Sequence, residues 1–204
     1  MAIVYIIFMF LAITSLSVCH PAGDVFQGCD DQGEAERLKE LVQCKKKQYS
    51  DFDKIERLLG SAAVSRDFSI VCNSMEKDSN CTDDYATLKC LPEQLKYSFQ
   101  SADEALKKAV NYMCENNYAN LAKFIDGGAP SCYTKGNGSN FADGCFEDLN
   151  AGSMFGNQLF CAIADSLSKC LKNKLGRCTQ DVRDVFEGYI FIYKQELRCE
   201  EKAK

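Results

Sequence analysis

Cysteine is the residue type whose number and spacing best limit the chemistry open to this chain. The sequence of 204 residues contains 13 cysteines and a single histidine, His20. Cys19 closes an apolar run near the start, and twelve cysteines follow it. An even number of cysteines predicts disulfide bridges, which are usual in exported proteins and rare in the cytosol. We expect six bridges, with partners that spacing does not decide, among Cys29, Cys44, Cys72, Cys81, Cys90, Cys114, Cys132, Cys145, Cys161, Cys170, Cys178 and Cys199.

Zinc binding and catalysis are the other uses of cysteine, and the sequence disfavours both. Structural zinc favours close ligand pairs, and no CxxC occurs in the chain. A Ser-His-Asp or Cys-His device, or the His-Asp pair of secreted phospholipases, needs a histidine inside the fold, and His20 precedes the first of the twelve cysteines. Neighbouring acids such as Asp83-Asp84 and Glu147-Asp148 face different ways on a helix and are expected at the surface. We predict no enzyme, no metal and no cofactor.

The start of the chain has the features of a secretory signal peptide. Residues 3–18 read IVYIIFMFLAITSLSV, and Ser17 and Cys19 are small residues at positions minus three and minus one of a cut before His20. An uncleaved anchor is the alternative, but the run is shorter than the ~20 residues that a membrane span prefers. No later stretch is long and apolar enough to cross a bilayer. The prediction is a signal peptide at 1–19 and a single secreted, extracellular domain at 20–204 with no membrane attachment.

The charge balance argues against a nucleic-acid partner. The chain has 24 basic and 29 acidic residues, a net charge of −5. Nucleic-acid binding requires a basic stripe, and the longest basic run covers only residues 45–47.

Apolar residues recur at intervals of three and four in several stretches, which predicts amphipathic helices. Gly60 and Gly176 are expected helix stops, Thr179 an N-cap, and Ser101-x-x-Glu104 a capping box at which a long helix restarts. No convincing β-hairpin pattern occurs, so the predicted fold is all-α, a disulfide-rich helical bundle. The helices are expected at residues 33–47, 52–59, 92–114, 154–175 and 179–199.

Cys72, Cys81 and Cys90 are spaced so that they cannot bridge one another within one helix. Nine residues of helix separate neighbouring Cα atoms by about 13 Å and turn them to opposite faces, whereas a disulfide needs Cα atoms within roughly 7 Å. These cysteines therefore either bond to other helices or the segment breaks, and the polar residues 77–80 are a suitable break.

Two Asn-x-Ser/Thr motifs are candidate glycosylation sites. Asn137-Gly138-Ser139 is a glycosylation acceptor in a loop-like stretch, and Asn80 also precedes a fitting Cys-Thr pair, although a bridged Cys81 can hide it.

Phe186, Tyr189 and Tyr193 lie on the expected inner face of the last helix. They could line a ligand cavity or pack in the core, and amphipathic helices need such a stripe for packing alone.

The cysteine spacing suggests two related halves, residues 29–114 and 132–199. The last three gaps are 8, 8 and 23 residues in the first half and 8, 7 and 20 in the second, and each half ends in Cys-Glu. Similar spacing favours duplication of a helical unit, with the same bridge pattern in both copies. Coincidence among many cysteines is the alternative, since the other residues barely match.

The stretch from Cys72 onward resembles the arthropod haemolymph glycoproteins of the 27 kDa type. The matching features are Cys114 followed by LAKFIDGGAPSC at 121–132, the triple Cys72, Cys81 and Cys90, and a tail that ends at Cys199. The resemblance implies a secreted, glycosylated protein of body fluid without known catalytic residues. An insect odorant-binding-like carrier is the second resemblance: the C-x8-C gap typical of those proteins is present here, but their C-x3-C gap is missing.

The predicted function is binding in an extracellular, haemolymph-type fluid, with a small apolar ligand or another protein as partner. Helix bundles readily enclose apolar cavities, which keeps the small-ligand version open. A secreted salivary or venom effector that acts on a host macromolecule is the alternative, and a hydrolase that uses carboxylates is a third hypothesis.

Overall fold

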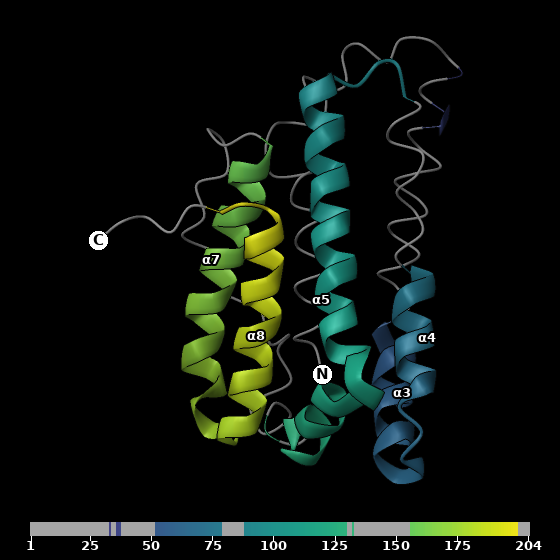
Figure 1. Ribbon diagram of the computed structural model, residues 1–204, viewed down its shortest axis with the longest axis vertical. Coiled ribbons are helices and arrows are strands. Elements are labelled where there is room, and N and C mark those ends of the chain that lie inside the picture. Colours follow the sequence, from purple (N-terminus) through teal and green to yellow (C-terminus); the bar gives the residue numbers. More distant parts are fainter. Residues whose placement is uncertain are drawn as a thin grey trace.

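The computed structural model describes residues 33, 36–37, 52–78, 88–129, 132 and 156–199, and within them the chain forms helices and no strand. The predicted disulfide-rich all-α fold is therefore confirmed. Of the expected first helix, Gly33, Glu36 and Arg37 are helical and the rest lies outside the described residues. The elements are α3 (Phe52–Ser65), α4 (Ser69–Asp78), α5 (Glu93–Asp126), α7 (Asn157–Lys174), the short 3-10 helix η3 (Leu175–Arg177) and α8 (Gln180–Glu196) (Figure 1).

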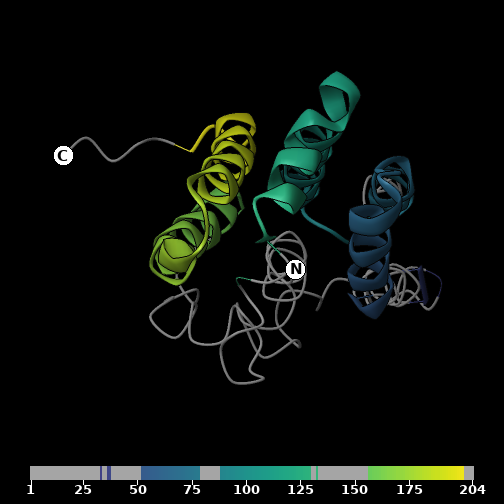
Figure 2. The same cartoon turned by 90° about the horizontal axis from the view of Figure 1, so that it is seen from below.

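The long helix α5 stands at the centre, with α7 and α8 on one side and α3 and α4 on the other (Figures 1 and 2). The α5–α8 contact is the most extensive between two elements of the described chain. These helices are antiparallel, because the ion pair Lys108–Glu196 (2.8 Å) joins the middle of α5 to the end of α8, and Lys123–Asp181 (3.0 Å) joins the end of α5 to the start of α8.

One apolar core runs through all the helices described. It contains the inner faces of α5, α7 and α8, and Leu121, Phe124 and Ile125 near the end of α5 are also buried. The ring of Phe99 on α5 meets that of Phe160 on α7 edge to face, with centroids 6.1 Å apart. Burial of this surface is the main stabilising contribution, because each large apolar side chain gains about 1.5–3 kcal/mol on leaving water.

Helix α5 breaks after Cys114, not at the predicted capping box. Ser101 and Glu104 lie within a continuous helix, so the predicted restart there is wrong. The helical geometry is lost at residues 115–118, where Asn116, Asn117 and Tyr118 take up left-handed conformations with φ of 52°, 57° and 62°. Asparagine tolerates this region better than most residues, which explains why the change of direction occurs at an Asn-Asn pair.

Gly60 does not end the helix that contains it. Helix α3 continues to Ser65, and Gly60 lies on its exposed face. Burial of Ala62 (0% exposed) beyond the glycine explains the difference, because packing stabilises the last turn more than one glycine destabilises it. The predicted stop was therefore wrong by one to two turns.

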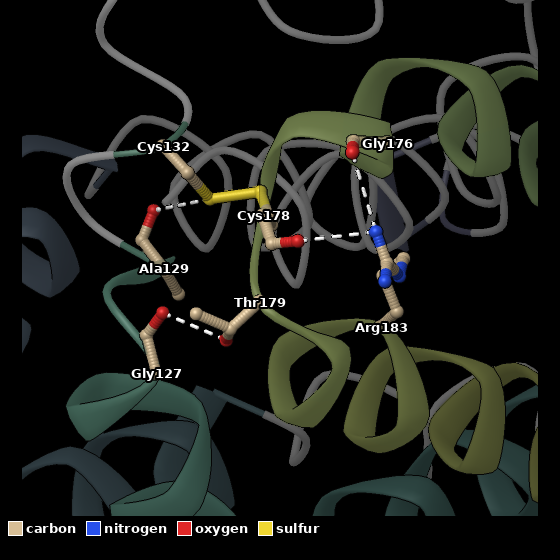
Figure 3. Close-up of a disulfide and its surroundings, with 7 residues drawn as sticks. All are labelled: Gly127, Ala129, Cys132, Gly176, Cys178, Thr179 and Arg183. Carbon is tan, nitrogen blue, oxygen red and sulfur yellow. Dashed lines mark hydrogen bonds between the residues drawn. A yellow bond between two sulfur atoms is a disulfide. The ribbon is translucent and has the colours of Figure 1, made fainter.

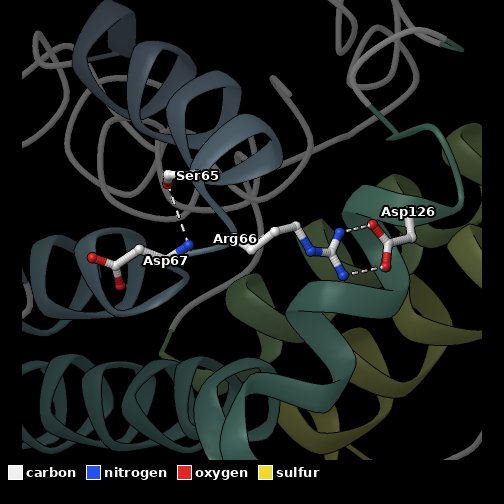
Figure 4. Close-up of polar contacts among 4 residues, drawn as sticks. All are labelled: Ser65, Arg66, Asp67 and Asp126. Carbon is white, nitrogen blue, oxygen red and sulfur yellow. Dashed lines mark hydrogen bonds and ion pairs between the residues drawn. The ribbon is translucent and has the colours of Figure 1, made fainter.

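The turn between α3 and α4 is attached to the end of α5. Arg66, at φ 61°, forms a two-pronged ion pair with Asp126, in which Nη2 donates to Oδ2 at 2.9 Å (Figure 4). The guanidinium also lies 5.0 Å from the ring centre of Phe68. In the same turn the Asp67 backbone N–H donates to Ser65 Oγ (3.2 Å), and Asp67 Oδ1 accepts from the Ser69 N–H (3.1 Å) at the start of α4.

Candidate functional site

Two disulfides each close a pair of antiparallel helices. Cys72 of α4 bonds to Cys114 of α5, with Cα atoms 5.9 Å apart. Cys161 of α7 bonds to Cys199, which follows α8, with Cα atoms 5.5 Å apart. Each bridge joins the beginning of the first helix of a pair to the place where the regular helix of the second ends. Each bridge therefore holds together the end of a helix pair that lies opposite the connection between the two helices.

A third disulfide, Cys132–Cys178, fixes the start of α8 beside the chain that follows α5 (Figure 3). Its Cα atoms are 5.4 Å apart. Next to it, Thr179 Oγ1 donates a hydrogen bond to the Gly127 carbonyl oxygen at 2.9 Å. Thr179 occupies the N-cap position of α8 as predicted, but its side chain makes no capping bond to the helix. The hydroxyl instead joins two segments that are distant in the sequence.

Glycine is required at position 127 by the same close approach. A Cβ atom there would lie 2.8 Å from both Thr179 Oγ1 and Val182 Cγ2. On the other side of the bridge, Arg183 Nη1 donates to the carbonyl oxygens of Gly176 (3.2 Å) and Cys178 (3.1 Å). The guanidinium therefore satisfies backbone acceptors that the end of η3 leaves open.

The other predicted site residues divide into two groups. Cys90 and Cys170 are disulfide-bonded. Within the described ranges no group of three or more His, Cys, Asp or Glu side chains is placed to hold a metal ion. The remaining predicted residues lie outside the described residues, and these are Cys29, Cys44, Cys81, Cys145, Asn80, Asn137, Asp83, Asp84, Glu147 and Asp148.

A half-open groove of about 310 Å³ is lined by residues of α7 and α8 and by Cys199. Phe191 is its most prominent apolar residue, with 60% of its surface exposed, and Ile190 beside it is buried. Phenylalanine is among the residue types most often found buried. The groove is lined by Ser168 and Lys172 of α7, by Glu187, Ile190, Phe191, Lys194 and Gln195 of α8, and by Cys199.

Charged side chains surround the apolar part of this groove. Lys194 Nζ lies 2.5 Å from Asp165 Oδ1, and Lys172 Nζ lies 3.5 Å from Glu187 Oε1. The side chains of Lys172 and Glu187 are 58% and 52% exposed, so water screens their pairing. The ammonium of Lys172 and the carboxylate of Glu187 can therefore exchange partners at little cost in free energy.

The apolar face that the sequence offered as a ligand lining is packed in the core. Phe186, Tyr189 and Tyr193 are 3%, 1% and 0% exposed. Side chains this inaccessible are in contact with other protein atoms on almost every side. Burial raises the pKa of Tyr189 well above its ordinary value. Its hydroxyl has no hydrogen-bond partner among the described residues.

The groove was missed by sequence reasoning, although one signal was present. Phe191 falls outside the predicted inner face of the last helix, between the buried Ile190 and Tyr193. One aromatic residue on the polar side of an amphipathic helix is a weak signal, because contiguous apolar patches mark interaction surfaces and single apolar residues are common on any surface. The lysines and Glu187 gave no signal, because charged residues on the outer face of a helix are the rule.

Residues 29–199 match the family described as "Protein of unknown function (DUF1397)". The chain belongs to this family. The match begins at Cys29 and ends at Cys199, the first and last of the twelve cysteines predicted to form bridges. No curated protein and no solved structure matches the chain significantly. Among the helices of the described residues, none combines the length and the apolar composition needed to span a membrane.

Proposed function

We propose that this protein is a secreted, non-catalytic binding protein whose α7–α8 groove docks onto another extracellular protein. Three disulfides among the described residues support an oxidising, extracellular location. The resemblance to haemolymph glycoproteins supports a body fluid as the place of action, and Asn137 and Asn80 as glycosylation sites. The observation that carries the binding proposal is the exposed Phe191 in a groove edged by charged side chains.

The composition of the groove favours a protein partner. Protein interfaces have an aromatic or apolar centre surrounded by a polar rim. Here Phe191 supplies the centre, and the rim consists of Lys172, Lys194 and Glu187, with Asp165 adjacent. A partner that inserts an apolar side chain over Phe191 can present its own charges to this rim, because the exposed Lys172–Glu187 pair can rearrange.

The shape of the groove and the packing of the core disfavour a small apolar ligand. Pockets for small molecules bury 70–90% or more of the ligand surface, whereas this groove is only about half enclosed. The aromatic residues of α8 that could have lined an enclosed cavity are packed against one another and their neighbours. A protein surface, in contrast, can cover an open groove completely.

The test compares wild type with Phe191→Asp and with Tyr97→Asp, a matched control. Tyr97 is also an exposed aromatic residue (58%), but it lies near the start of α5 and away from the groove. Each protein is cross-linked in the natural fluid of the source, and bound proteins are quantified by mass spectrometry. Circular dichroism checks that all three are folded. We expect a partner whose affinity falls by about 30-fold with Phe191→Asp, equivalent to about 2 kcal/mol, and stays unchanged with Tyr97→Asp.

Native mass spectrometry of the natural protein separates the competing functions. A captured extracellular protein that requires Phe191 supports the proposal. A co-purifying lipid with no protein partner, or a partner that Phe191→Asp retains at full affinity, refutes it. A captured macromolecule from another organism would identify the protein as a secreted effector, and turnover of a substrate with no partner bound would identify a hydrolase.

A further inference from the structure

The two halves of the chain close their helices in the same way. Counting within residues 29–114 and 132–199, the bridges Cys72–Cys114 and Cys161–Cys199 both join the third cysteine of a half to the sixth. The bridged residues are separated by 42 and 38 positions, and in each case the third cysteine lies on the first helix of an antiparallel pair. The gap lengths predicted the same bridge pattern in both halves, and the bridge from the third to the sixth cysteine follows that prediction.

The arrangement of the helices has the symmetry that a duplication would produce. In the order α4–α5–α8–α7, neighbours contact one another, and α5 and α8 meet at the centre (Figure 2). Lys108 pairs with Glu196, and Tyr112 lies against Gly188, so the residue numbers rise along α5 while they fall along α8. Two copies of one unit related by a two-fold axis perpendicular to the helices would place equivalent helices antiparallel in this manner.

Cys90 occupies in the first half the place that Cys178 occupies in the second. Each is the fifth cysteine of its half and directly precedes a central helix, with Pro92 at the N-cap of α5 and Thr179 at the N-cap of α8. Both pack against the core, and both are disulfide-bonded. The partner of Cys178 is Cys132, the first cysteine of its half.

We infer that the two halves are copies of one helical unit and that the bridge of Cys90 runs to Cys29, the first cysteine of its own half. Forming this bridge joins the two Sγ atoms and releases two protons and two electrons, which a disulfide oxidant of the export pathway accepts. The bridge would hold the start of α5 to the beginning of the first half, as Cys132–Cys178 holds the start of α8.

Bonding of Cys90 to its sequence neighbour Cys81 is the main alternative. The equivalent bond in the second half would join Cys170 to Cys178, and it does not form, because Cys178 bonds to Cys132. Cys170 is nevertheless disulfide-bonded. The unit thus pairs its fifth cysteine with its first, which leaves the second and fourth cysteines of each half to pair together.

Trypsin separates the relevant cysteines and allows a direct test on the wild-type protein. The protein is blocked with N-ethylmaleimide at acidic pH, digested without reduction, and analysed by mass spectrometry. Cys90 lies on the peptide 90–96, Cys81 on 78–89, Cys44 on 40–45, and Cys29 on the peptide that ends at Arg37. The same digest contains its own control, because the Cys132 peptide 124–135 should be joined to the Cys178 peptide 178–183.

We expect peptide 90–96 to be recovered joined to the peptide that ends at Arg37. Recovery of 90–96 joined to the peptide of Cys81 or Cys44, or to any peptide of the second half, overturns the inference. A second measurement uses the double variant Cys29→Ser/Cys90→Ser, in which thiol titration after unfolding without reductant should find no free thiol. Two free thiols in that variant would show that Cys29 and Cys90 each had another partner.

Discussion

Replacing Gly188 with alanine tests the contact between the two central helices. Gly188 lies in the middle of α8, and a Cβ atom there would come within 2.6 Å of Cζ of Tyr112 on α5. Alanine in a helix is favoured over glycine by about 1 kcal/mol, whereas overpacking costs about 1–3 kcal/mol. The ring of Tyr112 is half-buried and must leave α8 to make room. We therefore expect Gly188→Ala to lower the free energy of unfolding by about 1 kcal/mol.

Two variants show whether the tyrosine causes this loss. Gly60 is an exposed glycine inside α3, and a Cβ atom there would meet nothing within 4 Å, so Gly60→Ala should raise the free energy of unfolding by up to about 1 kcal/mol. In a Tyr112→Ala background, Gly188→Ala should stabilise by a similar amount. Urea unfolding with the disulfides intact gives all these values. If Gly188→Ala stabilises the wild-type protein as Gly60→Ala does, the proposed close approach of α5 and α8 is wrong.

Two further predictions concern a buried hydroxyl and an exposed ion pair. Tyr189→Phe should raise the free energy of unfolding by about 1 kcal/mol in urea titrations, because it removes a buried hydroxyl without a partner among the described residues. The hydrogen bond from Arg66 lowers the pKa of Asp126, so its contribution to stability is present above the ordinary aspartate pKa and is lost as the pH falls through the lower folded value. Urea midpoints of wild type and Asp126→Asn should therefore differ at pH 7 and converge as the pH falls below about 4.

Each of these two predictions has a clear opposite result. A loss of more than about 1 kcal/mol in Tyr189→Phe would mean that the hydroxyl makes a hydrogen bond. Tyr97→Phe is the control, and it should leave stability unchanged because Tyr97 is 58% exposed. For the ion pair, a midpoint difference that persists unchanged to pH 2 would show that Asp126 does not act through its charge.

Much of the fold could be predicted because local patterns determine it. The helices α5, α7 and α8 were predicted from apolar residues three and four positions apart, since a helix gathers such residues on one face. The nine-residue spacing predicted that Cys72, Cys81 and Cys90 bond to other helices or lie in a segment that breaks, and Cys72 does bond to another helix through Cys114. Boundaries were less predictable, because packing of Ala62 and the left-handed turn after Cys114 override local signals at Gly60 and at Ser101.

The candidate site was less accessible from the sequence than the fold. Phe191 differs from its buried neighbours only in the direction it faces, and that direction depends on where α5 and α7 lie against α8. Lys172 and Glu187 are 15 positions apart and meet only because their helices are antiparallel neighbours. The periodicity of the sequence does not show which helices will pack side by side.

The sequence by itself determined the helical class, the apolar face of each long helix and the use of cysteine for bridges, because these follow from periodicity and from the chemistry of each residue type. The tertiary structure decided which cysteines bond, where Thr179 directs its hydroxyl, and that α5 and α8 meet at the centre and leave Phe191 exposed. The physical reason is that periodicity sets which side of a helix avoids water, whereas the neighbour that covers that side is chosen by the packing of the whole chain.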